Sequence, residues 1–398
     1  MKALVTASIR CVVTPDGQVW TSNHSVDYSF WTRYLDVYDS VRLMVRTTPA
    51  TKPPADWVRV TGPGIEGIPL PDFHGPGEFL KSYTTVRRKV GAAVECSTAV
   101  HLRAPCPVAN LVWRSLSTGH PYGIEVIADP SDSFAPGAYK SPLRPVYRQW
   151  FIRRLRDQCR SASAAAYVTE SALQRRYPPG LHAFVTNFSS VHLPPDAFEA
   201  PKRRTYSASD AQQLVTVGTL EQLYKGPNIL LEAVARCVEE GWDLYLRVVG
   251  DGQYRLELEA LAKRLGISDR TRFDGRVPAG EPIRSRLREA DLFVLPSYQE
   301  GLPRATLEAM ALGLPCIGST VGGFVELLPE EDLVRPGDPA ALARKIAQVL
   351  SDPSRRELMS RRNAEKAREY ASEVLRERRI AFYRHVAQLT QDQVGLTP

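Results

Sequence analysis

Short apolar runs alternate with amphipathic segments through the second half of the chain, and this alternation constrains the fold more than any other feature. Apolar runs rich in valine and leucine lie at 214–217, 244–249 and 292–295. Segments with helical periodicity separate them, for example over 227–240. Because parallel strands of one sheet must be joined by a crossover, usually a helix, this order predicts βαβ units and a doubly wound parallel sheet. Such sheets bind ligands beyond the carboxyl ends of their strands.

The first half shows the same alternation less regularly, so the whole chain is expected to be α/β. Its 398 residues exceed one ordinary core, and two domains are therefore expected. The predicted parts are an N-terminal Rossmann-like domain over 1–195, a polar linker over 196–212, a C-terminal Rossmann-like domain over 213–375, and a final helix over 376–398 that can pack back on the N-terminal domain. In the first half, strands are predicted at 2–9, 41–47, 93–96, 124–128 and 165–169, helices at 77–90, 108–116, 142–161 and 170–177, and proline-rich loops at 49–54 and 62–76.

Composition and charge limit the class of protein and its partners. With 43% hydrophobic and 24% charged residues, and no apolar run near the roughly 20 residues that span a bilayer, the chain is typical of a soluble globular protein. Its six cysteines form no C-x-x-C pair, which is typical of reduced thiols in a cytoplasmic protein. The net charge of +7 lies mostly in residues 1–200, where 22 Lys and Arg face 16 Asp and Glu. This excess suits an acidic acceptor, an anionic membrane surface or nucleic acid, and a chance excess fits as well. Because no nucleic-acid-binding module accompanies it, no nucleic-acid partner is expected.

Two carboxylates eight positions apart, Glu300 and Glu308, flank a strand-to-helix turn. Pro303 suits the first turn of the helix, and the amides of Gly301 and Leu302 then lie at a helix N-terminus, which favours an anion. Glu308 lies about two turns into the helix, so both carboxylates can border one cleft and accept hydrogen bonds from sugar hydroxyls. A phosphate on the amides and a sugar on the carboxylates suggest a sugar nucleotide. From this segment alone, a surface helix with two solvated glutamates fits equally well.

Four motifs in order make the second half similar to glycosyltransferase family 4, a family of retaining GT-B enzymes. They are Val217-Gly218-Thr219-Leu220 with Lys225-Gly226, Val249-Gly250-Asp251-Gly252, the Glu300 to Glu308 segment, and Thr320-Val321-Gly322-Gly323 with Glu326. The resemblance covers about 214–375 well and the first half loosely. It implies a GT-B fold, in which two Rossmann-like doubly wound domains face each other across a cleft. It also implies transfer of a sugar from a nucleoside-diphosphate sugar to an acceptor, with retention of the anomeric configuration.

The resemblance also implies a role for each matching residue. Glu308 would accept hydrogen bonds from the ribose, Glu300 would contact a hydroxyl of the donor sugar, and Lys225 would neutralise the diphosphate. Further donor contacts are implied for Gly218, Thr219, Asp251, Val277 near the base, Gly301, Leu302 and Arg304. Structural alternatives remain, because an exposed lysine before a helix is common and an aspartate after a strand is often only a turn residue.

The sequence departs from the family pattern at several positions. Thr219 stands where the family usually has an arginine that grips the diphosphate, so Arg304, Arg276 or a base of the N-terminal domain compensates, or donor binding is weaker. A glycine-rich turn after the first strand is absent. Asp129 stands where members often carry a histidine, and we expect it to line the cleft and bind a sugar hydroxyl or the acceptor, although a turn-forming role fits as well. His120 lies near it in sequence and is a second candidate for acceptor binding.

No metal or cofactor is expected. The histidines lack metal-ligand spacing, and no D-x-D motif stands in a convincing context. Lys225 and the helix N-terminus would do the work of a divalent ion, so the enzyme is predicted to be metal-independent, with the nucleoside-diphosphate sugar as co-substrate. The acceptor can be a saccharide, a lipid-linked saccharide or a small metabolite.

A basic helix over 142–161 is the other notable segment. It carries six arginines against Asp157 alone, with Tyr147, Trp150, Phe151 and Leu155 at helical spacing. It can touch anionic lipid and hold a cytoplasmic enzyme at the inner face of a membrane. Packing of the aromatic stripe on the sheet is the favoured alternative.

Rival functions differ in what they require. A GT-B nucleotide-sugar epimerase shares the architecture but needs no acceptor, and a non-catalytic sugar-nucleotide-binding module would not need the intact carboxylates and lysine. A dinucleotide-dependent oxidoreductase would need G-x-G-x-x-G after the first strand, which is absent here.

Overall fold

A computed structural model shows two compact units of α/β structure, and each is described by itself. The structure describes residues 1–73, 75–95, 99–133, 143–199 and 211–395. Of these, the first unit contains the described residues up to 133 together with 143–188 and 376–395, and the second contains 189–199 and 211–375. Most of the predicted linker, residues 200–210, lies outside the described residues, and the predicted domain boundaries stay predictions.

The first unit is built on one nine-stranded sheet in the order β4-β2-β1-β6-β7-β8-β9, with β3 paired to β1 and β5 paired to β3. The strands are β1 (Lys2–Val13), β2 (Val19–Thr21), β3 (Ser40–Pro49), β4 (Val58–Arg59), β5 (Ile65–Pro71), β6 (Ala99–Ala104), β7 (Tyr122–Val126), β8 (Ala164–Tyr167) and β9 (Phe184–Asn187). All pairs are parallel except those that β2 makes with β1 and β4. The predicted parallel α/β sheet is therefore confirmed for this half.

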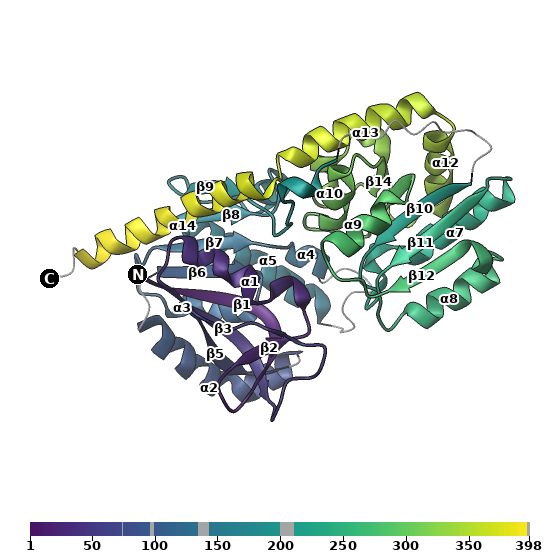
Figure 1. The fold of residues 1–398 in the computed structure, drawn as a ribbon. Coiled ribbons are helices and arrows are strands. Elements are labelled where there is room, and N and C mark those ends of the chain that lie inside the picture. Colours follow the sequence, from purple (N-terminus) through teal and green to yellow (C-terminus); the bar gives the residue numbers. More distant parts are fainter. Residues whose placement is uncertain (74, 96–98, 134–142, 200–210, 396–398) are drawn as a thin grey trace. The chain divides into compact units, whose positions relative to one another are not determined.

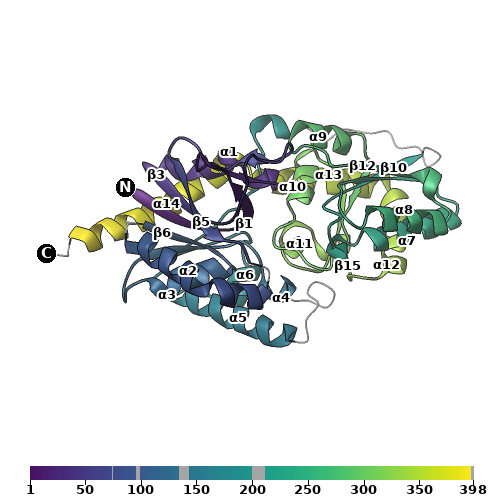
Figure 2. The same ribbon diagram turned by 90° about the horizontal axis from the view of Figure 1, so that it is seen from below.

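Helices cover both faces of this sheet. They are η1 (His24–Val26), α1 (Tyr28–Trp31), η2 (Thr32–Asp36), α2 (Gly75–Glu95), α3 (Pro107–Ser115), α4 (Pro130–Ser133), α5 (Arg144–Ser161), α6 (Ala172–Arg176) and α14 (Ser372–Gly395). In Figures 1 and 2, α2, α3 and α5 lie on one face and α1 and α14 on the other. The larger apolar core lies between the sheet and α2, α3 and α5. The opposite face holds an aromatic cluster in which α14 takes part, with Phe382 and Tyr383 fully buried.

Two expectations for the first half are wrong. The strand predicted at 93–96 is not there, because α2 continues to Glu95 and the strand begins at Ala99. The loop predicted over 62–76 contains β5, which pairs with β3 along seven residues and includes Pro69. Since β5 pairs on one side only, it is an edge strand, and an edge tolerates the missing proline N–H. Proline content therefore gave a misleading signal there.

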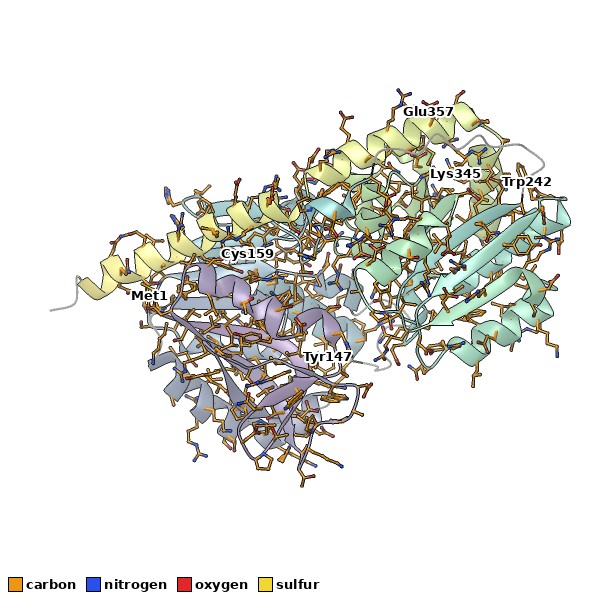
Figure 3. The ribbon with its side chains drawn as sticks, viewed as in Figure 1. Met1, Tyr147, Cys159, Trp242, Lys345 and Glu357 are labelled. Carbon is orange, nitrogen blue, oxygen red and sulfur yellow. The ribbon has the colours of Figure 1, made fainter. Side chains whose placement is uncertain are left out.

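The aromatic face predicted for 142–161 is only partly buried. Residue 142 lies outside the described residues, and α5 begins at Arg144. Its buried side chains are Ile152, Leu155, Gln158 and Cys159, the last of which is labelled in Figure 3. They recur every three or four residues, so one face of the helix packs on the core. Trp150 is 41% exposed instead of packing on the sheet. The apolar row of the helix is therefore shifted from the predicted stripe, and of that stripe only Leu155 is buried.

The second unit is a six-stranded, all-parallel sheet in the order β12-β11-β10-β13-β14-β15. Its strands are β10 (Gln212–Val217), β11 (Leu244–Val249), β12 (Thr271–Gly275), β13 (Leu292–Val294), β14 (Cys316–Ser319) and β15 (Leu333–Val334). Its helices are η3 (Pro195–Ala197), η4 (Leu223–Lys225), α7 (Pro227–Glu239), α8 (Arg255–Arg264), η5 (Ser268–Arg270), α9 (Glu281–Arg288), α10 (Arg304–Ala311), α11 (Phe324–Leu327), η6 (Glu330–Asp332), α12 (Pro339–Leu350) and α13 (Pro353–Arg368). Helices α7, α8 and α12 pack on one face and α9, α10 and α13 on the other (Figure 2). The predicted doubly wound fold is confirmed here too.

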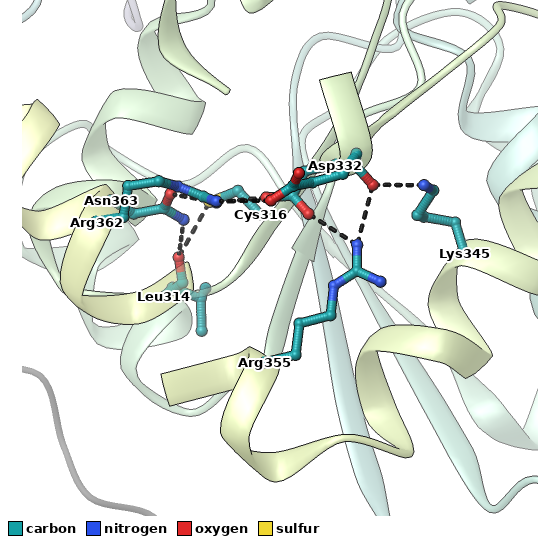
Figure 4. A network of polar contacts seen from close by, with 8 residues as sticks. Leu314, Cys316, Asp332, Lys345, Arg355, Arg362 and Asn363 are labelled. Atoms are coloured by element: carbon teal, nitrogen blue, oxygen red, sulfur yellow. Dashed lines mark hydrogen bonds and ion pairs between the residues drawn. The ribbon is translucent and has the colours of Figure 1, made fainter. Parts of the chain in front are cut away.

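A buried carboxylate fastens α13 to the strand pair at the edge of this sheet (Figure 4). Asp332 is fully buried, and its carboxylate accepts hydrogen bonds from Arg355, at 3.0 Å, and from Arg362. Beside it, the Asn363 amide donates to the carbonyl of Leu314 at 2.9 Å. Because Leu314 leads into β14 and Asp332 into β15, these contacts hold the two strands in register. The loop that follows β14 is thereby held in place.

Candidate active site

Four loops meet at one edge of the second sheet. Gly218 follows β10, Gly250 follows β11, Pro296 follows β13 and Thr320 follows β14. These strands are neighbours in a parallel sheet, so their carboxyl ends lie at the same edge. The four motifs that carry the family resemblance are thus brought together by the topology, where a doubly wound fold binds ligands.

Two glycines let these loops approach each other closely. Gly226 has φ +69°, and a Cβ there would lie 2.2 Å from the carbonyl oxygen of Pro296. Gly322 has φ +51°, and a Cβ there would lie 1.8 Å from the carbonyl oxygen of Glu300. Both positions require glycine for two reasons: the backbone is left-handed, and a Cβ would clash with the neighbouring carbonyl oxygen. The loops that carry Lys225 and Gly322 therefore pack directly on the segment that follows β13.

This packing brings Lys225 and Glu300 into contact. Lys225 Nζ lies 2.5 Å from Glu300 Oε1, and the two side chains are 19% and 7% exposed. The Ser297 hydroxyl donates to the same carboxylate oxygen at 2.8 Å. Ser297 is held in turn by Ser319, whose hydroxyl donates to its carbonyl at 2.5 Å. A partly buried carboxylate with a cation and a hydroxyl donor has its hydrogen-bonding capacity well satisfied, so these contacts fix the position of Glu300.

The next helix, α10, presents donors and a second carboxylate. Pro303 is its N-cap residue rather than part of its first turn, where it was predicted. Within the described part of the chain, the amides of Gly301 and Leu302 donate no hydrogen bond, so they can bind an anion. Glu308 is half-buried and has no hydrogen-bonding or ionic partner among the described residues. Burial raises the pKa of Glu308, and the nearby Arg304 and Arg284 guanidiniums oppose that shift.

The other predicted donor-binding residues surround this group. A Cβ at Gly218 would lie 3.2 Å from Lys225 Cγ, so Gly218 directly adjoins the lysine. Thr219 is exposed, and its hydroxyl accepts from the amide of Glu221. Arg304 is exposed at the start of α10, with Nη1 3.5 Å from the Ser190 hydroxyl.

Asp251 and Val277 lie on two further loops of the same unit. One Asp251 oxygen accepts from the amide of Gly252 at 2.9 Å, and the other lies 3.6 Å from Arg255 Nη1. These are contacts of a turn residue, and the predicted donor contact of Asp251 stays a prediction. Val277 is half-buried in the connection between β12 and α9.

The two candidates in the first unit lie at opposite edges of its sheet. Asp129 follows β7, at the carboxyl ends of the parallel strands, whereas His120 precedes β7. His120 therefore does not share the edge where ligands bind, and its proximity in sequence was misleading. Burial lowers the pKa of its imidazole.

Asp129 is engaged within the first unit. It is buried, and its carboxylate accepts from the amide of Ser131 at 2.7 Å, from the Tyr177 hydroxyl and from Arg176. These contacts use both oxygens to hold α4 and α6 beside β7. They favour the turn-forming and positioning role of Asp129 over direct binding of a sugar.

Sequence reasoning missed Ser297 and Ser319. Ser297 lies three residues before Glu300 in a strand-to-loop transition, and that spacing was the available signal.

In the ranges that the structure describes, no three His, Cys, Asp or Glu side chains come together as metal ligands do. Five of the six cysteines are buried free thiols, and Cys96 lies outside the described residues.

Comparison with known proteins agrees with the motifs. Residues 198–367 match the family described as Glycosyl transferases group 1. Protein CapJ of Staphylococcus aureus is 22% identical over 343 residues, which cover 84% of both chains. D-inositol 3-phosphate glycosyltransferase of Corynebacterium urealyticum is 32% identical over 206 residues, which cover 49% of this chain and 48% of that protein.

One solved structure extends the comparison to the whole chain. Alr3699/HepE of Anabaena, solved in complex with UDP and glucose, has a TM-score of 0.63 at 17% sequence identity and covers 100% of both chains. At that identity the likeness shows the fold alone. The fold is GT-B.

Proposed function

We propose that this GT-B protein, which carries a group 1 glycosyltransferase domain over residues 198–367, transfers a sugar from a nucleoside-diphosphate sugar to an acceptor hydroxyl. The observation that carries the proposal is the contact of Lys225 with Glu300 beside the free amides that precede α10. The UDP and glucose bound by Alr3699/HepE, which has the same fold, support a sugar nucleotide as the donor.

The diphosphate of the donor binds between Lys225 and the amides of Gly301 and Leu302. As the bond from the sugar C1 to the phosphate oxygen breaks, the diphosphate takes the electron pair and gains negative charge. A fixed cation and fixed amide dipoles stabilise that charge more in the transition state than in the ground state. The acceptor oxygen forms the new bond to C1, and its proton passes to the departing phosphate. Attack from the face of the leaving group gives retention, which is proposed from the resemblance to family 4.

The carboxylates select the rest of the donor. Glu308, which has no partner among the described residues, accepts hydrogen bonds from the ribose hydroxyls. Glu300 binds a hydroxyl of the transferred sugar and also keeps Lys225 in place through their 2.5 Å contact. Since Thr219 supplies no cation, we assign that task to Arg304, which is exposed one helical turn before Glu308.

Lys225 and α10 supply the positive potential that a divalent ion supplies elsewhere, so the proposed reaction is metal-independent and uses no further cofactor. The acceptor is a saccharide, a lipid-linked saccharide or a small metabolite. The epimerase alternative is not favoured, because the family match is to glycosyl transferases and the Corynebacterium urealyticum relative is named as one. A cytoplasmic location is part of the proposal.

A donor screen tests the proposal. Thermal unfolding is measured with UDP, GDP, ADP and dTDP and with their sugars, and one nucleotide series should raise the melting temperature well above the others. The stabilising sugar nucleotide is then incubated with the enzyme alone and with acceptor mixtures. Release of the nucleoside diphosphate that depends on an acceptor supports a transferase. An altered sugar nucleotide formed without acceptor would mean an epimerase, and no stabilisation by any nucleotide would contradict both.

We also propose peripheral contact with an anionic membrane through the first turns of α5. Leu143, Val146 and Trp150 are 53%, 63% and 41% exposed, and their spacing places them on one face of the helix. Arg148 and Arg153 are exposed beside them. Exposed apolar side chains among arginines suit the interface of an anionic bilayer. No helix in the described part of the chain is both long and apolar enough to cross a bilayer.

Liposome pelleting tests this contact. The wild-type protein should pellet with vesicles that contain anionic lipid more than with neutral ones, and the variant Val146→Ser/Trp150→Ser should lose the difference. Leu181→Ser is the matched control, since Leu181 is 99% exposed elsewhere in the same unit. Equal pelleting of Val146→Ser/Trp150→Ser and Leu181→Ser with anionic vesicles would contradict the membrane proposal. Pelleting of the wild type that does not depend on lipid charge would contradict it as well.

A further inference from the structure

Arg103 and Glu125 form a buried ion pair in the first unit, close to the carboxyl ends of two neighbouring strands. They face each other in register on β6 and β7, and Arg103 Nη1 lies 3.1 Å from Glu125 Oε2. Each is the last residue but one of its strand. The pair therefore lies where parallel sheets of this class bind ligands. Taken alone, it is electrically neutral.

A second arginine is fixed beside the first. Arg33 Nε donates to the carbonyl of Phe30 at 2.6 Å, and its guanidinium lies 3.7 Å from the centroid of the Phe30 ring. The Arg103 guanidinium lies 4.8 Å from the same centroid. Both cations are thus held on one aromatic ring. Arg33 has no carboxylate within ion-pair distance among the described residues.

The C-terminal helix brings a third arginine. Arg379 lies one turn before Tyr383 on α14, and the Tyr383 ring stacks on Tyr34 with centroids 4.5 Å apart. Tyr34 and Tyr383 both donate to Glu125 Oε1, at 2.5 and 3.5 Å. The same face of α14 therefore meets Glu125.

Arg379 itself has no counter-ion. Its Nε is buried without a hydrogen-bond partner, and no ion pair engages it in the described ranges. Asp36, which also attracts Arg379, is gripped by both Nε and Nη2 of Arg376, at 3.2 and 2.8 Å.

The cluster consequently holds three guanidiniums and one carboxylate at ion-pair distance. Burial lowers the pKa of Arg33 to about 10, and the neighbouring Arg379 and Arg103 add to the shift. Burial also lowers the pKa of Arg379. Arg33 and Arg379 are half-buried, so each loses part of its hydration, and a partly desolvated charge is stabilised by a counter-ion. If the cluster only docked α14, one arginine for Glu125 would suffice. A bound anion would balance the other two.

We propose that Arg33, Arg103 and Arg379 form a binding site for an anionic group of the acceptor, a phosphate or a carboxylate. The link to the acceptor rests on the proposed transferase function. The forked guanidinium can donate two hydrogen bonds to either kind of oxyanion. Such a site would account for part of the excess of positive charge in residues 1–200. The acceptor class is thus narrowed to acidic saccharides, sugar phosphates and similar anionic metabolites.

Thermal unfolding of the full chain in increasing inorganic phosphate, at constant ionic strength, tests the site. Phosphate should still stabilise Lys225→Ala, in which the donor site is damaged, because the arginine cluster is intact in that variant. Arg379→Gln and Arg33→Gln should weaken phosphate binding by about tenfold or more. Arg384→Gln, which removes the same charge from an exposed position of α14, should behave as wild type. Equal stabilisation of all the arginine variants would overturn the site. If Arg33→Gln does not fold, Arg379→Gln still decides.

Glucose 6-phosphate, compared with inorganic phosphate, tests the link to the acceptor. Glucose 6-phosphate should stabilise the wild type more than inorganic phosphate does, and this gain should vanish in Arg379→Gln. No gain over inorganic phosphate would overturn the acceptor assignment. Stabilisation of Arg379→Gln by the donor nucleotide should remain at the wild-type level. A failure of the donor screen with an intact phosphate effect would therefore count against the transferase proposal and not against the anion site.

Discussion

Lys225 is the residue on which the proposed chemistry depends most. Its Nζ is 2.5 Å from Glu300 and adjoins Gly218, so it is fixed where the diphosphate is expected. Lys225→Ala should lower kcat/KM by about 100-fold or more, because a preorganised donor to the leaving group is lost. The rate of nucleoside-diphosphate release measures this effect. Lys263→Ala, an exposed lysine of α8 in the same unit, is the control. Wild-type turnover by Lys225→Ala would contradict its assigned role.

Glu308 should make donor binding sensitive to acid. Burial raises its pKa above the ordinary value of 4.5, so the carboxylate protonates at a higher pH than an exposed glutamate. A protonated Glu308 is a poorer acceptor for ribose hydroxyls, and the affinity should therefore fall as the pH is lowered towards this raised pKa. Titration calorimetry with a sugar nucleotide measures it, since its diphosphate is esterified at both ends and does not titrate there. In Glu308→Gln the affinity should be lower than that of the wild type above this pKa, and the pH dependence should be lost. An unchanged pH profile would show that another group titrates.

At the scale of residues, the spacing of the two carboxylates around a strand-to-helix turn predicted Glu300 and Glu308, and the resemblance to family 4 implied Lys225. Ser297 escaped prediction, since its hydrogen bond to Glu300 depends on the path of the loop. The contacts of Asp129 with Arg176 and Tyr177 join positions 47 and 48 apart, which only the fold brings together. The pairing of Lys225 with Glu300 was likewise not visible in the sequence.

At the scale of elements, the contacts of Asp332 with Arg355 and Arg362, which join α13 to the β14–β15 pair, should contribute strongly to stability. Asp332→Asn removes a fully buried carboxylate from Arg355 and Arg362, and should lower the free energy of unfolding by about 3 kcal/mol. Urea denaturation measures the loss. Glu330→Gln removes a charge from the exposed side of the same turn and should change stability by less than about 0.5 kcal/mol. Equal free energies of unfolding for the two variants would show that the ion pairs of Asp332 do not stabilise the protein.

The elements of the second unit were predicted well because each strand is a short apolar run followed by a helix of clear periodicity. The 244–249 run matches β11 residue for residue. In the first unit the signals conflicted. Alanines and Val94 near the end of α2 resemble a strand, and the prolines of β5 resemble a loop. In both cases the tertiary setting, a long helix and a sheet edge, decided against the local pattern.

At the scale of the whole molecule, the two units divide the proposed work. The second unit holds the donor group around Lys225 and Glu308, and the first holds the arginine cluster around Glu125 together with α5. The uneven charge of the sequence follows this division, since the basic excess lies in residues 1–200. A basic excess in the unit that is proposed to bind the acceptor is consistent with an anionic acceptor.

A crystal structure with the nucleotide that gives the largest thermal shift would test the central claim most directly. We expect density for the diphosphate beside Lys225 Nζ and the amides of Gly301 and Leu302, with the ribose hydroxyls on the carboxylate of Glu308. Density for the nucleotide at any other place in either unit would contradict the assigned donor site.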